Sequence, residues 1–126
     1  MRCDANRQGK LVTAGGLGKW AQWKVEKKGR KIEGCPVVGF RNVGNFKEGE
    51  RKCWLAIKAN QMCTGGGGEH CEFIVKPNGK AIKLIKAKNQ SKACGINKKG
   101  EFKKAGNLGD GDGGKWFIFD CDDISG

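Results

Sequence analysis

The chain has 126 residues, with 25 lysines and arginines against 13 aspartates and glutamates, so its formal net charge at pH 7 is +12. This length fits one domain with its own hydrophobic core, and the longest apolar runs are only a few residues long, which excludes a transmembrane helix of about 20 apolar residues. The excess of positive charge predicts anionic partners and carries no information about the fold. At the start of the chain, residues 1–6 contain no apolar stretch, so we expect neither a signal peptide nor membrane insertion.

One spacing recurs three times along the chain. In each case a cysteine stands twelve residues before a glycine, and an aromatic residue follows that cysteine after 20, 20 and 23 residues respectively. The three pairs are Cys3 with Trp23, Cys53 with Phe73, and Cys94 with Phe117. Such self-similarity is the signature of a repeat architecture.

The predicted strands after these cysteines follow in chain order. Residues 23–25 alternate between inward and outward positions, and residues 38–43 form the next strand. Residues 73–75 form a strand that a turn connects to residues 82–84, whose alternation points Lys83 outward. Residues 117–119 form the last alternating strand, with Phe117 directed into the core.

These strands predict one all-β domain of three four-strand units, spanning approximately 1–50, 51–91 and 92–126. The 22 glycines support this class, because glycine weakens helices and punctuates short strands. Three units that close into a barrel leave no free sheet edge.

The seven cysteines include no C-x-x-C pair, which excludes a zinc ribbon and a thioredoxin motif. Their odd number favours reduced thiols, and we therefore expect a cytoplasmic protein, with secretion as the alternative.

The second and third units resemble the repeat of a known group of proteins. Residues 52–58 (KCWLAIK), the glycines at 65–68 and residues 69–73 (EHCEF) resemble the repeat of β-trefoils of the fascin-like and fibroblast-growth-factor-like groups. Residues 94–102 with the later Trp-Phe pair repeat the pattern. The resemblance implies a β-trefoil fold. It favours the fascin-like group, because His70 and Val75 stand where the growth-factor signature has acidic residues and the chain has no tyrosine.

No catalytic or metal-binding constellation emerges from the sequence. His70 is the single histidine, and Cys71 beside it falls on an inward position of a strand, which predicts a buried and inert thiol. The spacing of Cys63, His70 and Cys71 matches no closed zinc site. The glycine-rich stretches lack the helix that a phosphate loop needs, and residues 110–121 lack the ligands of a calcium loop. We expect no enzyme activity, no metal and no cofactor.

Lysine clusters are the remaining functional signal. The cluster favoured as the binding surface comprises Lys98, Lys99, Lys103, Lys104 and Lys115. Lysines at 76, 80, 83, 86, 88 and 92 form another cluster, for which a solvated surface is the alternative to a binding surface. In growth-factor-like trefoils the heparin-binding surface lies in the third repeat, so the resemblance adds weight to the first cluster.

We therefore expect a non-catalytic binding domain that engages an acidic protein or a polyanion through lysine-rich loops. The resemblance to fascin-like trefoils implies F-actin as the leading partner. The alternative is an extracellular growth-factor-like protein that binds heparan sulfate, a sulfated glycan. Arginine forks and exposed aromatics are scarce in the predicted surface, so nucleic-acid binding is expected to be salt-sensitive and not sequence-specific.

Overall fold

A computed structural model describes residues 2–5, 10–14, 18–97, 101–104 and 112–117. The strands are β1 (Arg2–Ala5), β2 (Leu11–Ala14), β3 (Trp23–Ile32), β4 (Cys35–Asn42), β5 (Trp54–Lys58), β6 (Gln61–Gly65), β7 (Phe73–Asn78), β8 (Ala81–Lys86), β9 (Cys94–Ile96) and β10 (Phe102–Lys104). The helical segments are α1 (Val43–Lys47) and the 3-10 turns η1 (Lys19–Ala21), η2 (Glu69–Cys71) and η4 (Asp112–Gly114).

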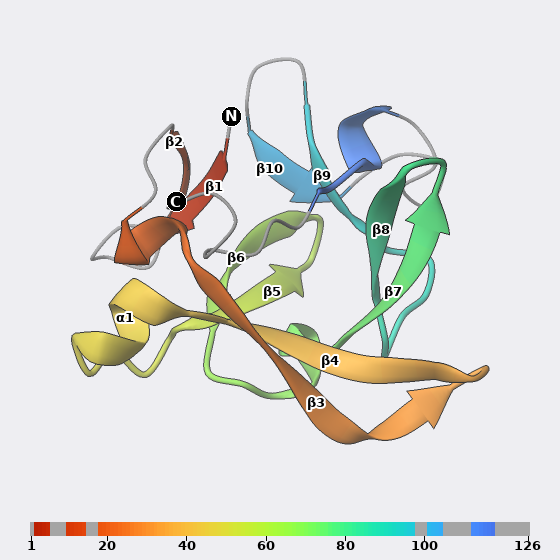
Figure 1. The fold of residues 1–126 in the computed structure, drawn as a ribbon, viewed down its shortest axis with the longest axis horizontal. Coiled ribbons are helices and arrows are strands. Elements are labelled where there is room, and N and C mark those ends of the chain that lie inside the picture. Colours follow the sequence, from red (N-terminus) through yellow and green to blue (C-terminus); the bar gives the residue numbers. More distant parts are fainter. Residues whose placement is uncertain (1, 6–9, 15–17, 98–100, 105–111, 118–126) are drawn as a thin grey trace.

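The fold is all-β, as the sequence predicts. Eight strands form one antiparallel sheet in the order β8-β7-β4-β5-β6-β10-β9, with β3 paired to β4, and β1 and β2 form a separate two-stranded sheet. The large sheet curls into a half-barrel, from which the long, twisted β3–β4 hairpin extends (Figure 1). Among the described residues, no helix is both long enough and apolar enough to cross a membrane.

The core lies inside the curl of the sheet and draws on all three units. Its buried members come from β1, β2 and β4 to β9, and they include Phe40, Ile57 and Phe73. Phe40 and Phe73 pack with their ring centroids 6.0 Å apart. Because these residues are far apart in sequence, their burial joins the units into one packed body.

The repeated cysteine–aromatic spacing has a structural counterpart. Each of η1, η2 and η4 ends two residues before an aromatic residue that packs on the core, namely Trp23, Phe73 and Trp116. The Trp23 indole Nε1 donates to the Cys3 carbonyl at 2.8 Å, and the Trp116 Nε1 donates to the Cys94 carbonyl at 3.1 Å. The first unit and the third unit each contain a hydrogen bond from a tryptophan side chain to a cysteine carbonyl.

The prediction that Phe117 points into the core is wrong, because its chain neighbour Trp116 packs on the core instead. Trp116 exchanges two backbone hydrogen bonds of 2.9 Å with Ile82, and its ring stacks on Phe102 inside the core cluster. Since neighbouring residues of an extended chain face opposite sides, Phe117 points outward and is 62% exposed. The core aromatic of the third unit therefore follows its cysteine after 22 residues, and the spacing exceeds that of the other units by two residues instead of three.

The prediction for residues 23–25 also fails at its last position. Trp23 packs on the core, but Val25 is 47% exposed. The equivalent Val75 in the second unit does pack against the core. The difference arises because β3 leaves the barrel beyond Trp23 and, within the described residues, pairs only with β4.

Candidate functional site

The lysine cluster predicted in the third unit lies partly within the described residues. Lys98 and Lys99 lie outside them, and Lys104 is described only as a backbone position at the end of β10. Lys103 is central in β10, opposite Gly95 of β9 and Gln61 of β6. Lys115 is exposed and immediately precedes Trp116.

One aromatic stack connects Lys103 and Lys115. Phe102 and Trp116 lie with their ring centroids 6.3 Å apart and their planes 20° apart. Each of the two lysines is the chain neighbour of one of these inward rings, so both lie on the outer side of the stack. The Lys103 ammonium is 3.7 Å from the Glu101 carboxylate, and a hydrogen bond from Asn97 together with the Lys103 charge lowers the pKa of Glu101.

A second group of side chains combines cations with aromatic rings on β3, β4, α1 and β5. We name it the Trp54 cluster, and its members are Lys28, Arg41, Phe46 and Trp54. The Lys28 Nζ lies 3.8 Å from the centroid of the Trp54 ring. The Arg41 guanidinium carbon lies 3.8 Å from the Phe46 centroid and 5.8 Å from the Trp54 centroid. Both cations therefore sit at cation–π distance from a ring.

Glycines make room for the Trp54 ring. A Cβ at Gly39 would lie 2.8 Å from the Lys28 side chain and 3.0 Å from the Trp54 ring. A Cβ at Gly67 would lie 3.0 Å from the Trp54 Nε1, and Gly67 also has a φ of +97° that side chains rarely adopt. The glycine-rich segment after β6 thus has a defined role at Gly67, because it lets backbone pass close to the indole.

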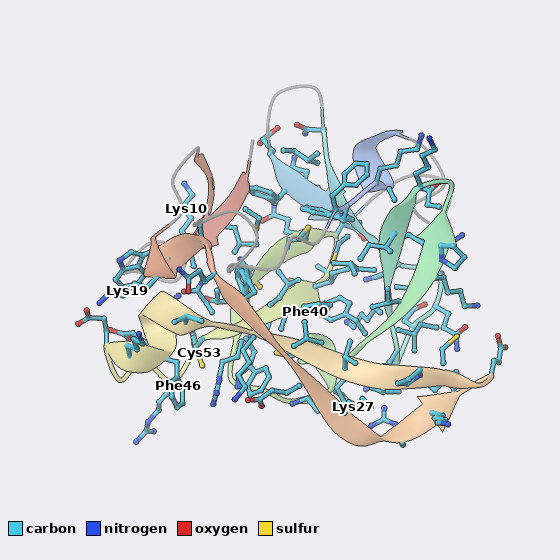
Figure 2. The ribbon with its side chains drawn as sticks, viewed as in Figure 1. Lys10, Lys19, Lys27, Phe40, Phe46 and Cys53 are labelled. Atoms are coloured by element: carbon cyan, nitrogen blue, oxygen red, sulfur yellow. The ribbon has the colours of Figure 1, made fainter. Side chains whose placement is uncertain are left out.

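Helix α1 holds Phe46 at the surface. The buried Asn42 side chain caps the helix by accepting from the Asn45 N–H at 3.0 Å, and its amide donates to the Trp20 carbonyl at 2.9 Å. The Trp20 ring packs so closely on the helix that a Cβ at Gly44 would lie 2.5 Å from it. With this side of α1 covered, Phe46 projects outward (Figure 2), and the residue is 51% exposed.

The surroundings of the Trp54 cluster are basic. Arg41 forms an ion pair of 3.0 Å with Glu26, whose carboxylate is also 3.9 Å from Lys24. Lys47 follows Phe46 in α1, and Lys52 lies two residues before Trp54; both are exposed, and neither has a carboxylate partner among the described residues. Glu48, which is paired with Lys19, and Glu50 lie in the same segment, so cations outnumber carboxylates around the aromatic face but do not stand alone there.

A buried lysine corrects the inclusion of Lys86 in a cluster of surface lysines. Lys86 is only 4% exposed, and its ammonium donates to the Ile57 carbonyl at 2.8 Å and to the His70 Nδ1 at 2.7 Å. Burial, reinforced by the charges of Lys92 and Lys88, lowers the pKa of Lys86. Lys86 stands opposite Phe73 in the β7–β8 ladder, just as Asn42 stands opposite Trp23 in the β3–β4 ladder. Both units thus place a buried polar side chain at this position.

The buried state of Cys71 is confirmed. Its residue is 1% exposed, and burial raises the pKa of its thiol. The neighbouring His70 has its Nδ1 engaged by Lys86, so that nitrogen is not available as a base toward a thiol. Within the part of the chain that is described, no three His, Cys, Asp or Glu side chains are grouped to hold a metal ion.

The sequence patterns missed Arg41, Phe46, Trp54 and the burial of Lys86. The spacing of Phe46 and Trp54 fits neither the cysteine repeat nor a strand alternation, although the basic stretch between them was a visible signal. Comparison with protein-family models and with curated proteins finds no match to this sequence.

Proposed function

We propose that this chain is a β-trefoil domain of the fascin-like kind that binds an acidic protein surface, with F-actin as the favoured partner, and that it has no catalytic role. Support for the trefoil comes from the three 3-10 turns that precede a core aromatic and from the tryptophan–cysteine hydrogen bonds of the first and third units. The binding surface that we propose comprises lysines of strand β10 and of the segments around it in the third unit: Lys98, Lys99, Lys103, Lys104 and Lys115.

The observation that carries this proposal is the position of Lys103 and Lys115 on the outer side of the Phe102–Trp116 stack. Two rings packed on the core hold the backbone beneath both lysines, so a cationic surface there is preorganised. An acidic filament surface offers the complementary charge.

Elsewhere on the described surface, carboxylates pair with only some of the cations. Several exposed cations have no carboxylate partner among the described residues: Lys27, Lys31, Lys47, Arg51, Lys52 and Lys80. This excess draws the domain toward polyanions in general and makes its binding salt-dependent. We also propose a cytoplasmic location, because the six described cysteines are free thiols, which persist in reducing compartments.

Co-sedimentation with F-actin at near-physiological salt tests the proposal. We expect saturable pelleting that is lost when Lys98, Lys99, Lys103 and Lys104 are changed together to glutamate. The matched control changes Lys27, Lys31, Arg51 and Lys80 to glutamate, which alters the net charge equally on exposed residues elsewhere. The control variant is expected to pellet like the wild type.

Two outcomes would contradict the proposal. Equal loss in both variants would mean that general charge attraction, not the third-unit surface, binds actin. Absence of pelleting together with retention on heparin to high salt would replace the cytoskeletal function with the glycan-binding alternative.

A further inference from the structure

The Trp54 cluster is not used by the proposed function and lies apart from it. Figure 1 places α1, which carries Phe46, at the opposite side of the molecule from η4 and β8, beside which Lys115 lies. Its chemistry also differs from a plain lysine patch, because two cations are stacked on two aromatic rings.

Phe46 offers a flat apolar face at the surface. Arg41 covers the ring at 3.8 Å on one side, yet the residue remains 51% exposed. Helix α1 is held in place by Asn42 and Trp20, so the exposed ring is presented on a fixed support.

Four cations neighbour this face in the structure, along the chain or across the β3–β4 ladder, and Glu26 pairs with two of them. Arg41 lies against one face of the Phe46 ring, and Lys24 of β3 stands opposite Arg41 in the β3–β4 ladder. Along the chain, Lys47 follows Phe46 and Lys52 lies two residues before Trp54. A carboxylate or a sulfate group would use only the cations of this surface and not the aromatic ring. A ligand that also matches the ring must carry a flat aromatic group next to a negative charge.

We propose that the Trp54 cluster binds single-stranded nucleic acid without sequence preference. A nucleobase stacks on the exposed face of Phe46, and the adjoining phosphates pair with Lys24, Lys47 and Lys52. A nucleotide is the polymer unit that supplies a flat π-face and an anion together, and base stacking on aromatics within a basic surface is how such strands are held. Sulfated glycans lack the π-face, and an acidic protein segment supplies one only where it also carries an aromatic side chain.

Fluorescence anisotropy of a labelled oligo(dT) or oligo(U) of about ten nucleotides, titrated with the full chain, tests the inference. We expect Phe46→Leu to weaken binding roughly tenfold, because it removes the stacking face while keeping an apolar side chain. Phe46→Trp is expected to retain the wild-type affinity. Thermal unfolding of both variants checks that the fold is intact.

The control is Phe117→Leu, which alters the other strongly exposed phenylalanine of the described residues, on the third unit. It should leave the oligonucleotide affinity unchanged. Lys47→Gln combined with Lys52→Gln should reduce the dependence of affinity on salt concentration, because fewer counterions are released.

Heparin separates a nucleic-acid site from a general polyanion site. We expect Phe46→Leu to leave heparin retention unchanged while it weakens oligonucleotide binding. Equal affinity of wild type and Phe46→Leu for the oligonucleotide, or equal losses in Phe46→Leu and Phe117→Leu, would overturn the inference. Pelleting with F-actin is expected to be the same for wild type and Phe46→Leu, so the two proposals fail independently.

Discussion

Lys86 shows how a single buried charge is accommodated without a carboxylate. Its ammonium is satisfied by a backbone carbonyl and an imidazole nitrogen, and the nearest acid, Glu69, is paired with Lys88. Hydrogen bonds to neutral acceptors repay only part of the cost of removing an ammonium from water. The charged form of Lys86 is therefore disfavoured in the folded chain, which is the physical meaning of its lowered pKa.

Lys86 makes stability depend on alkaline pH. Because the pKa of Lys86 is lower in the folded chain than its ordinary value of 10.5, the unfolded chain binds more protons between the two values. The stability that this group contributes is complete above 10.5 and is lost as pH falls through the folded pKa. The free energy of unfolding of wild type, relative to Lys86→Met, should rise as the pH increases from the folded pKa of Lys86 towards 10.5.

Urea unfolding at several pH values measures this difference. Lys80→Met, at the exposed turn between β7 and β8, is the control and should show no such rise relative to wild type. Parallel pH profiles of wild type and Lys86→Met would contradict the prediction.

Burial also decides which thiols react. Burial raises the pKa of the Cys71 thiol and raises that of Cys94 further, whereas Cys35 and Cys63 are partly exposed. Since the thiolate is the reactive form, iodoacetamide should modify Cys35 and Cys63 before Cys71 and Cys94. Mass mapping over time in native buffer measures the order. Rapid modification of Cys71 would revive an enzymatic use of this thiol.

At the scale of elements, α1 depends on a glycine for its contact with η1. Alanine in place of glycine in a helix usually stabilises it by about 1 kcal/mol. Here the added Cβ at Gly44 would lie 2.5 Å from the Trp20 ring, so Gly44→Ala should instead destabilise the protein by about 1–3 kcal/mol. A urea titration measures the change, and the cost should largely vanish when the same substitution is made in a Trp20→Ala background. A stabilising Gly44→Ala in wild type would mean that the helix does not pack this closely.

The strand register of the third unit leaves Phe117 exposed, whereas the Phe73 side chain of the second unit is buried. Phe73 is fully buried in β7, and Phe117 is exposed beside Trp116. Phe73→Ala should lower the free energy of unfolding by about 3–5 kcal/mol, whereas Phe117→Ala should change it by at most about 0.5 kcal/mol. Chemical denaturation of both variants measures the difference. Equal losses would restore the original alignment, in which both residues are core aromatics.

At the scale of the whole molecule, strand pairing connects units that are distant in sequence. β10 pairs with β6 of the second unit, and Trp116 bonds to Ile82 of β8. The third unit therefore has no separate sheet within the described residues, and its core residue Cys94 belongs to the same cluster as Phe40. Such sharing favours a single cooperative unfolding transition.

Two tryptophans report on this cooperativity. A variant that keeps only Trp23 and another that keeps only Trp116, with phenylalanine at the remaining tryptophans, follow the first and third units separately. In each variant the fluorescence and far-ultraviolet circular dichroism transitions in urea should coincide. A Trp116 transition that precedes the circular dichroism change would show that the third unit unfolds by itself.

Much of the fold was predictable from local patterns. Residues 73–75 and 82–84 alternate with period 2, and they are found in β7 and β8. The cysteines at 3, 53 and 94 mark β1, the residue before β5, and β9. These predictions succeeded because strand alternation and spacing depend on neighbouring residues. The one-residue error at Phe117 has the reverse cause, since a slip by one residue turns a strand's other face inward and only the pairing with Ile82 selects between the two.

For the candidate sites, the sequence predicted only the sign of the charge that attracts a partner and not the position of the site. Composition alone establishes a net charge of +12 and hence attraction to anions. Where that charge can act depends on contacts between distant segments: Arg41 stacks on Phe46 only because α1 turns back beside β4, and Lys86 is buried only because Ile57 and His70 converge on it. The sequence by itself thus determined the all-β class and the sign of the net charge. The tertiary structure decided which lysine is inside and which aromatic ring is outside, because burial is a property of the segments that meet and not of the residue that is buried.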